Sequence, residues 1–413
     1  MSEALRLTPE AAPWLGDPEI QAVLAALSAG GATPRFVGGC VRNAILASGP
    51  TDVDVAIDAP PEETVRLLEA AGLRAIPTGI EHGTVTTLAG SEPLEVTSLR
   101  RDVETDGRRA VVAFTTDWAE DARRRDFTIN ALYADRTGAV FDPLGSGVAD
   151  LRARHVRFIG RAEERIREDY LRILRFYRFA AWYGDAAPEA ADLAAIETLR
   201  DGIAQLARER VGHEMRKLLS APRPARALSA MAAAGVLARV LPEADAEPLA
   251  ALEQLEAALD AAPAAARRLA ALMRAAAGSD PDGVAEQAAE ALRLSIAETR
   301  DLRARLAANA ARPEEAGYRF GAAAAADALL IAAAARDPAV EADLLRSPLA
   351  AARRGATRSR PVEAPDLLAL GFTPGPALGA ALRAAEQAWI DSDFSLDKAA
   401  LLEQARKKVR EAD

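Results

Sequence analysis

The chain has 413 residues, 50% of them hydrophobic, and a formal net charge of -10. This length is enough to bury a large core and to form two or more domains. Because the chain is acidic overall, a nucleic-acid partner would have to be held by local basic patches. The single cysteine, Cys40, excludes an intrachain disulfide framework and indicates a reducing compartment.

No export or membrane signal stands out in the chain. The first twenty residues carry acids and a proline where a signal peptide would need a basic end and an apolar run. The longest apolar run, which starts at Gly321, is mostly alanine, contains Asp327 and is shorter than a bilayer span. We therefore expect a cytoplasmic protein with no membrane contact and no disulfide-linked partner.

The stretch 36–58, FVGGCVRNAILASGPTDVDVAID, follows a lead-in helix over 19–29 and organises the N-terminal part. Its pattern predicts a strand, a glycine turn, a short helix and a second strand. Gly38 and Gly39 precede the helix, whose free N–H groups and dipole favour an anion. The alternative for two glycines in isolation is an ordinary turn.

Asp52 and Asp54 are predicted on the second strand of this stretch. Side chains alternate along a strand, so the two aspartates should project to one face while Val53, Val55 and Ile57 project to the core. Two adjacent carboxylates repel each other unless a cation lies between them, and hard oxygen ligands suit Mg²⁺. The alternative for the pair in isolation is a solvated strand edge.

The rest of the region up to Phe141 mixes strand and helix periods. A helix is expected over 62–71, and strands are expected over 83–88, 94–98 and 110–114, which predicts a small mixed sheet. Glu95 alternates with Leu94 and Val96 and could join the aspartate pair, the alternative being an exposed strand glutamate. The polar segment 100–113 is typical of a mobile hairpin or loop over the site.

Three consecutive arginines, Arg123 to Arg125, precede the segment DFTINAL. Guanidinium groups bind triphosphate oxygens, often two at a time, although a solvated helix turn is the alternative. After Pro143 the periods are helical throughout. The fold class is therefore α+β, and we expect four parts: a head with a small mixed sheet over 1–145, and an all-helical neck, body and tail over 146–220, 221–345 and 346–413.

Several motifs together resemble a known family. GGCVRN with TDVDVA, then EVTSLR, the TDGRRAVVAFTTDWAEDARRRDFTINAL block, DPLGSGVADL, EDYLRILRFYRFA and ARERVGHEMRKLL follow one another in the order expected for class II tRNA nucleotidyltransferases. This family comprises the CCA-adding enzymes and their relatives the bacterial poly(A) polymerases, within the polymerase-beta-like superfamily. The resemblance runs from about residue 35 to 220. Asn43 departs from it, since the family more often has aspartate there.

The residues of the EDYLRILR motif also predict a role of their own. On a continuous helix, Asp169 and Arg172 would share a face, opposite an apolar stripe. A carboxylate acceptor beside a guanidinium donor matches the Watson–Crick edges of cytosine and adenine and rejects those of uracil and guanine. The resemblance implies this base-reading role, and Glu168, four residues before Arg172, is expected to orient the arginine. The alternative is a surface ion pair.

The resemblance implies template-independent addition of C and A to the tRNA 3′ end from CTP and ATP, with release of pyrophosphate and with Mg²⁺ as cofactor. The implied catalytic residues are Asp52, Asp54 and Glu95, of which Asp52 and Asp54 hold the metal. The residues expected to bind the nucleotide are Gly38, Gly39, Arg42, Arg124, Arg125, Asp126, Asn130, Asp169, Arg172, Arg175 and Arg178.

Alternative functions stay open at this stage. A bacterial poly(A) polymerase shares every head motif, and a partial enzyme that adds only CC or only A uses much the same residues. A non-catalytic RNA-binding protein is disfavoured by the intact Asp52 and Asp54 pair.

Overall fold

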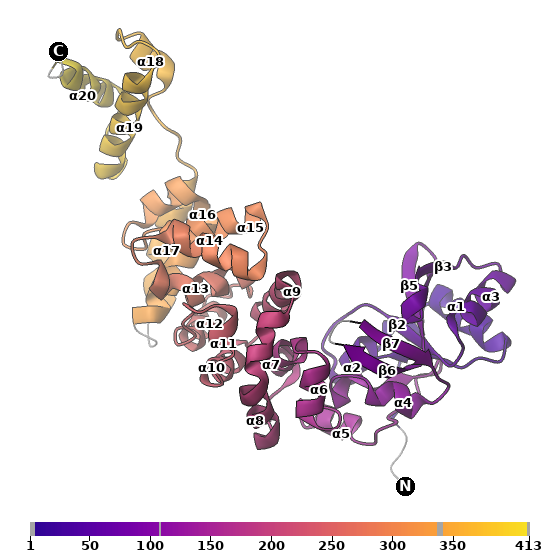
Figure 1. The fold of residues 1–413 in the computed structure, drawn as a ribbon. Coiled ribbons are helices and arrows are strands. Elements are labelled where there is room, and N and C mark those ends of the chain that lie inside the picture. The colour runs from indigo at the N-terminus through magenta and orange to yellow at the C-terminus, as the bar shows by residue number, and fades with distance from the viewer. Residues whose placement is uncertain (1–4, 107–108, 337–341, 411–413) are drawn as a thin grey trace. The chain divides into compact units, whose positions relative to one another are not determined.

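The computed structural model describes residues 5–106, 109–336 and 342–410 (Figure 1). The chain divides into two compact units, Met1–Pro242 and Glu243–Asp413. The expected class is confirmed, because a mixed sheet lies in the first unit and the rest of the described chain is helical. The finer division into head, neck, body and tail stays a prediction.

The N-terminal part of the first unit is a seven-stranded sheet with its helices. Its strand order is β3-β4-β5-β2-β1-β8-β9, and every neighbouring pair is antiparallel except β2 with β5. A separate hairpin, β6–β7, covers the segment expected to be a hairpin or loop, apart from residues 107–108, which lie outside the described residues. The elements of this part are η1 (Pro13–Leu15), α1 (Pro18–Ala29), β1 (Pro34–Val37), α2 (Gly39–Leu46), β2 (Asp54–Ile57), α3 (Pro61–Ala70), β3 (Ile76–Gly79), η2 (Ile80–His82), β4 (Thr84–Ala89), β5 (Glu92–Ser98), β6 (Arg100–Asp106), β7 (Arg109–Phe114), α4 (Trp118–Arg123), η3 (Thr128–Asn130), β8 (Tyr133–Ala134), β9 (Val140–Phe141) and α5 (Gly147–Arg152).

Helices α1 and α3 cover one face of this sheet. Helix α1 starts where the Asp17 side chain accepts hydrogen bonds from the backbone N–H groups of Glu19 and Ile20, with a proline in the first turn. It ends at Gly30, which lies so close to Leu67 of α3 that an added Cβ would meet that side chain at 1.9 Å. A glycine therefore lets the two helices approach each other over the sheet, where they pack on β4 and β5.

The helices that follow the sheet complete the first unit. They are α6 (Ala162–Glu168), α7 (Leu171–Tyr183), α8 (Ala190–Leu199), η4 (Arg200–Gln205), α9 (Arg208–Leu219), α10 (Ala225–Ala233) and α11 (Leu237–Val240). Helix α7 packs against α9 and α10. Phe158 lies between Phe127 and Phe176 of α7, with ring centroids 4.9 and 5.5 Å away. This aromatic cluster fixes α7 to the segment that follows the arginine run.

The second unit is helical over its described residues. Its helices are α12 (Leu249–Ala258), α13 (Ala265–Ala277), α14 (Pro281–Leu292), α15 (Ile296–Ala307), α16 (Pro313–Arg336), α17 (Ala342–Ala356), α18 (Ala364–Leu368), α19 (Pro376–Asp391) and α20 (Lys398–Arg410). Tyr318 of α16 packs edge-on against Trp389 of α19, at a centroid distance of 5.6 Å. The alanine-rich segments are thus bundle helices, as their leucine spacing predicts.

Helix α16 is long and apolar enough to cross a membrane by length and composition alone, and 44% of its most apolar window is buried inside the protein. It packs against α12, α13, α15 and α17, and its backbone is interrupted at Gly321. A helix buried in this way by its neighbours is what the sequence predicts for this apolar run.

Asp327 of α16 is a buried carboxylate that joins two other helices. Its Oδ1 accepts a hydrogen bond from Arg267 Nε at 2.6 Å, and its Oδ2 accepts one from Arg305 Nε at 2.7 Å. We expect Asp327→Ala to lower the free energy of unfolding by about 1–3 kcal/mol, because two partly buried guanidinium groups each lose one hydrogen-bonded carboxylate. Arg267 keeps Glu256, and Arg305 keeps Asp301. Urea denaturation of the full chain measures this change.

Asp343→Ala is the matched control. Asp343 pairs with Arg346, and both side chains are largely exposed, so the change should stay within about 0.5 kcal/mol. Equal effects of the two substitutions would contradict the structural role assigned to Asp327.

Candidate active site

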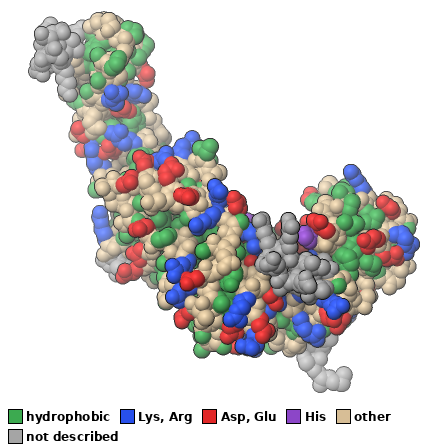
Figure 2. All heavy atoms as spheres, in the orientation of Figure 1, with side chains coloured by type: hydrophobic (Ala, Val, Ile, Leu, Met, Phe, Trp, Pro, Cys, Tyr) green, Lys and Arg blue, Asp and Glu red, His purple; other side chains and the backbone are tan. Residues whose placement is uncertain are grey.

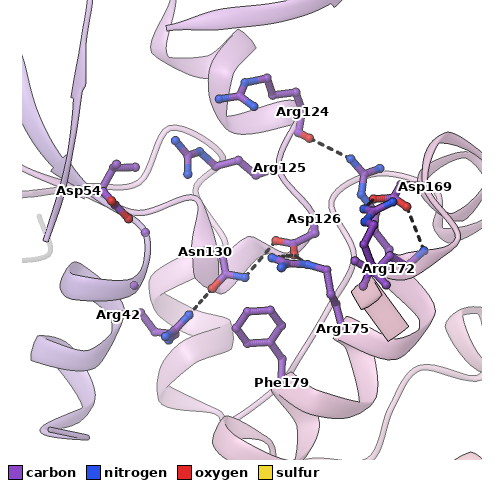
Figure 3. Close-up of a pocket in the computed structure, with 15 residues that line it drawn as sticks. Arg42, Asp54, Arg124, Arg125, Asp126, Asn130, Asp169, Arg172, Arg175 and Phe179 are labelled. Atoms are coloured by element: carbon purple, nitrogen blue, oxygen red, sulfur yellow. Dashed lines mark hydrogen bonds and ion pairs between the residues drawn. The ribbon is translucent and has the colours of Figure 1, made fainter. Parts of the chain in front are cut away.

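A cavity of about 440 Å³ lies where the sheet, the arginine run and helix α7 meet (Figure 3). Six arginines and three aspartates line it, so its lining carries a surplus of positive charge that suits a polyanion. The lining residues are Val37, Gly38, Gly39, Arg42, Asp54, Arg124, Arg125, Asp126, Asn130, Asp169, Leu171, Arg172, Arg175, Phe179 and Arg210.

The glycine turn forms one wall of the cavity. Gly38 has φ of 72°, in the left-handed region that glycine adopts without strain, and it turns the chain from β1 into α2. The N–H groups of the first turn of α2 are therefore directed as the sequence predicts for an anion. Asn43, the departure from the family pattern, accepts hydrogen bonds from Arg42 at 2.9 and 3.1 Å.

The acids lie at the start of β2. Asp54 pairs with Glu95 across the parallel β2–β5 ladder, as expected for a glutamate that joins the aspartate pair. The expectation for Asp52 was wrong in one respect: β2 begins at Asp54, so exposed Asp52 lies in the preceding loop. Gly49, which has a positive φ, and Pro50 lie in this loop, so the strand starts later than the sequence predicts. Burial raises the pKa of Asp54 to about 6, and the charges of Glu95 and Asp52 act in the same direction.

These acids fit a divalent cation that also binds the substrate. In the described part of the chain, no set of three or more His, Cys, Asp and Glu side chains is arranged to hold a metal ion by itself. Asp52 and Asp54 would supply oxygen ligands, and the raised pKa of Asp54 reflects burial and negative charge that a cation would offset. Mg²⁺ is commonly held by one or two carboxylates together with substrate phosphates, so the incomplete set is consistent with it.

A buried aspartate that the sequence analysis missed holds the arginine run. Asp121 accepts hydrogen bonds from Arg124 at 2.8 Å, from Arg125 at 2.9 Å and from the Tyr133 hydroxyl at 2.7 Å. Burial acts to raise the pKa of Asp121, but the two arginines and the tyrosine hold it well below its ordinary value. Asp121 precedes Arg124 by three residues and Arg125 by four, a helical spacing from which these ion pairs could have been predicted.

A second buried network joins the glycine side of the cavity to α7. Asp126 accepts from Asn130 at 3.0 Å and from Arg175 Nε at 2.7 Å, and Asn130 Oδ1 accepts from Arg42 at 2.5 Å (Figure 3). Burial acts to raise the pKa of Asp126, but Arg175 and Asn130 lower it to about 2. Phe179 lies beneath, with the Arg175 guanidinium 5.3 Å from its ring centroid.

Asp169 and Arg172, the pair predicted to read the base, both line the cavity but do not lie on one helix. Helix α6 ends at Glu168 and α7 begins at Leu171, so Asp169 has extended backbone and its side chain accepts the Leu171 N–H at 3.1 Å. The expectation that Asp169 and Arg172 share a helix face was therefore wrong. The carboxylate caps α7 instead, and it also accepts from Arg210 of α9 at 2.7 Å.

Arg172 is held by three groups behind the cavity. Its Nη1 donates to the Arg165 carbonyl at 2.8 Å and to the Glu168 carboxylate, and its Nη2 donates to the Arg124 carbonyl at 3.3 Å. The ion pair between Glu168 and Arg172 is the contact that the sequence predicts, although the role assigned to it stays a prediction.

Eleven of the fifteen residues that the sequence analysis selected line this one cavity. The other four are Asp52, Glu95, Glu168 and Arg178, and Arg178 pairs with Glu214 of α9 at 3.0 Å. The sequence analysis missed Phe179 and Arg210. Phe179 continues the helical spacing of Arg172 and Arg175 and could have been found, whereas no local signal connects Arg210 to Asp169.

With acids at one end and fixed guanidinium groups along its walls, the cavity suits a nucleoside triphosphate. The fold and the site define a protein of the nucleotidyltransferase class. Residues 34–157 match the family described as Poly A polymerase head domain, and residues 188–247 match the probable RNA and SrmB-binding site of polymerase A.

The relatives are named for one activity. The chain is 46% identical over 190 residues to the mitochondrial CCA tRNA nucleotidyltransferase 1 of Danio rerio, covering 45% of this chain and 43% of that protein. It is 44% identical over 208 residues to the CCA-adding enzyme of Oceanobacillus iheyensis, covering 50% of each. The matched part thus spans about half the length of these curated relatives.

The structural similarity extends further along the chain. The crystal structure of the Bacillus stearothermophilus CCA-adding enzyme in complex with CTP matches with a TM-score of 0.73 and 29% identity, covering 95% of this chain and 98% of that one. These matches support the resemblance of the chain to CCA-adding enzymes and poly(A) polymerases.

The electrostatic coupling of the acids can be tested without a metal. Glu95→Gln removes a negative charge beside Asp54, so the pKa of Asp54 should fall from about 6 toward its ordinary value, while burial keeps it from returning fully. The carboxyl ¹³C shift of Asp54, followed against pH by NMR without divalent ions, measures this pKa.

Glu92→Gln, at the other end of the same strand, is the control and should leave that pKa unchanged.

Because the folded-state pKa of Asp54 is raised, its contribution to folding stability is present at low pH and is lost as pH rises through about 6. Stability that instead increases over this range in the wild type, relative to Asp54→Asn, would contradict the assignment.

Proposed function

We propose that this chain is a CCA-adding nucleotidyltransferase, which adds C and A to the 3′ end of tRNA from CTP and ATP without a template and releases pyrophosphate. The observation that carries the proposal is that one cavity is lined both by Asp54 of the sheet and by Asp169 and Arg172, the base-reading pair. The names of the relatives, and the CTP bound in a structural neighbour, support the same substrates.

The reaction is an in-line displacement. The 3′-hydroxyl oxygen of the RNA attacks the α-phosphorus, a new P–O bond forms, and the bond to the bridging oxygen of the pyrophosphate breaks. Asp52 and Asp54 would hold Mg²⁺, which when bound favours the ionised hydroxyl and offsets the triphosphate charge. Glu95, next to Asp54, either completes the acid set or accepts the hydroxyl proton.

The chain's own residues bind and orient the nucleotide. The first turn of α2, with Gly38 and Gly39, binds phosphate oxygens, and Arg124 and Arg125 neutralise the triphosphate from positions fixed by Asp121. The Arg42, Asn130, Asp126 and Arg175 network supports the ribose and phosphates from below. These groups are already paired with the protein, so little reorganisation accompanies binding.

Base choice follows from the donors and acceptors that remain at Asp169 and Arg172. Asp169 accepts the amino group of cytosine or adenine, while Arg172 donates to the adjacent ring nitrogen. Uracil and guanine present a carbonyl and an N–H in these places, so each mismatched group costs about 1–3 kcal/mol. Glu168 keeps the guanidinium in place from outside the cavity.

Arg172→Ala tests the base-reading role. We expect incorporation of C and A to fall and the preference over U and G to drop by at least about tenfold, because one of the two edge contacts is lost. Competition assays with paired nucleotides measure the preference. Arg167→Ala is the control, since this exposed arginine lies on α6 outside the cavity. A preference unaltered in Arg172→Ala would refute the role.

The incorporation assay distinguishes the proposed function from its alternatives. The full chain is given all four nucleotides with tRNA that lacks its CCA end, and in parallel with a generic RNA. Three defined nucleotides on tRNA support the proposal, a long adenosine ladder indicates a poly(A) polymerase, and a product that stops at CC or at a single A indicates a partial enzyme.

Asp54→Ala should abolish incorporation in the same assay while tRNA binding stays largely intact, because the substitution removes a metal ligand and no RNA contact. Binding is measured separately by filter retention. Turnover equal to that of the wild type would overturn the metal assignment. Activity that is lost when divalent ions are removed and that returns when Mg²⁺ is added would support Mg²⁺ as the metal.

We also infer that the protein works in the cytoplasm. The inference is supported by the single buried cysteine and by the absence of a disulfide within the described residues.

Figure 2 shows Lys and Arg intermixed with Asp and Glu over the visible face, which supports local rather than general contacts to tRNA.

A further inference from the structure

A band of threonine hydroxyls continues the acid row across the sheet. Asp54 on β2 pairs with Glu95 on β5, and Glu95 pairs with Thr86 on β4. The Thr86 hydroxyl contacts that of Thr78 on β3, with the two oxygens 2.7 Å apart. Acids and hydroxyls therefore form one row over four neighbouring strands.

A second pair lies beside this row on the same face. Thr84 and Thr97 are two residues from Thr86 and Glu95, so their side chains project to the same side, and their hydroxyl oxygens are 3.1 Å apart. Each hydroxyl has one donor hydrogen and two acceptor lone pairs, so a bonded pair retains a donor and several acceptors for a ligand.

This face is open while the other face is core. Val85 and Val96, which alternate with these threonines, are fully buried where α1 and α3 pack on β4 and β5. On the threonine side, Thr78 and Glu95 are exposed and Thr84 and Thr97 are half-buried, whereas Thr86 is buried beneath its contact with Thr78. A ligand that reaches Asp54 can therefore lie along the hydroxyls.

The sheet order assigns this face to one of the two substrates. Strand β1, which leads into the glycine turn and the nucleotide cavity, lies on one side of β2, whereas β5, β4 and β3 lie on the other. In-line attack requires the attacking hydroxyl opposite the leaving pyrophosphate. With the triphosphate on the β1 side of Asp54, the attacking RNA end must come from the β5 side.

We infer that Thr78, Thr84 and Thr97 bind the ribose-phosphate backbone of the last RNA nucleotides and position the 3′-hydroxyl beside Asp54, while buried Thr86 holds the Thr78 hydroxyl in place. The inference rests on the proposed function and adds to it the surface that holds the acceptor strand. Neutral hydroxyls suit this role, since they bind ribose hydroxyls and phosphate oxygens of any sequence without competing for the metal.

The double variant Thr84→Val with Thr97→Val tests this surface, because valine keeps the shape and the strand preference but removes both hydroxyls. We expect the KM for tRNA lacking its last nucleotide to rise roughly fivefold or more, because two hydrogen bonds are lost. The dissociation constant for CTP, measured without RNA, should stay within about twofold, since the nucleotide cavity is untouched.

Thr87→Val is the matched control. Thr87 lies on β4 next to Thr86 but on the core face, so its substitution should leave the KM for tRNA unchanged. Thr78→Ala, at an exposed position, is a second variant that tests the inference if the double variant folds poorly. It should also raise the KM for tRNA.

Two outcomes would overturn the inference. One is a KM for tRNA that stays within about twofold in both threonine variants, and the other is a CTP dissociation constant that rises in parallel with it. The proposed function fails separately, since wild-type protein that adds no nucleotide to any RNA would refute it before the variants are compared.

Discussion

The arrangement of the site depends on one buried carboxylate, Asp126. It accepts hydrogen bonds from Asn130 and Arg175 and from the backbone N–H of Phe127, and Asn130 in turn holds Arg42. Arg42, which is proposed to bind the nucleotide, and helix α7, which carries the predicted base-reading arginine, are thereby joined by one hydrogen-bonded network. Because the pKa of Asp126 is lowered to about 2, its carboxylate stays ionised near neutral pH.

The carboxylates at the site fall into two groups according to the charges around them. Asp121 and Asp126 are paired with arginines, which hold their pKa values low and fix the side chains in place. Asp54 has acidic neighbours instead, and burial raises its pKa. Asp121 and Asp126 are thus paired directly with arginines, whereas the charge of Arg125 only partly offsets burial and the acidic neighbours at Asp54. The raised pKa of Asp54 costs folding stability near neutral pH, as is common where a site is kept ready for a cation.

Most of the head could be predicted from the sequence because its signals are local. The glycine turn, the position of Asp54 and the arginine run follow from short spacings. Asp169 was placed wrongly because the helical period continues from α6 into α7 with no glycine or proline, whereas the backbone is extended at Asp169 and its side chain accepts the first N–H of α7. Arg210 could not be found, since its contact depends on how α9 packs against α7, a long-range property that short spacings do not carry.

The one parallel pair in the sheet has a consequence for biosynthesis. Antiparallel neighbours can form as soon as a tight turn is made, but β2 and β5 can join only after the whole crossover between them, with α3, β3 and β4, has been translated and packed. A nascent chain that has reached β2 already contains both aspartates yet has no Glu95 beside them. The acidic cluster therefore forms only after β5 has been translated and has paired with β2.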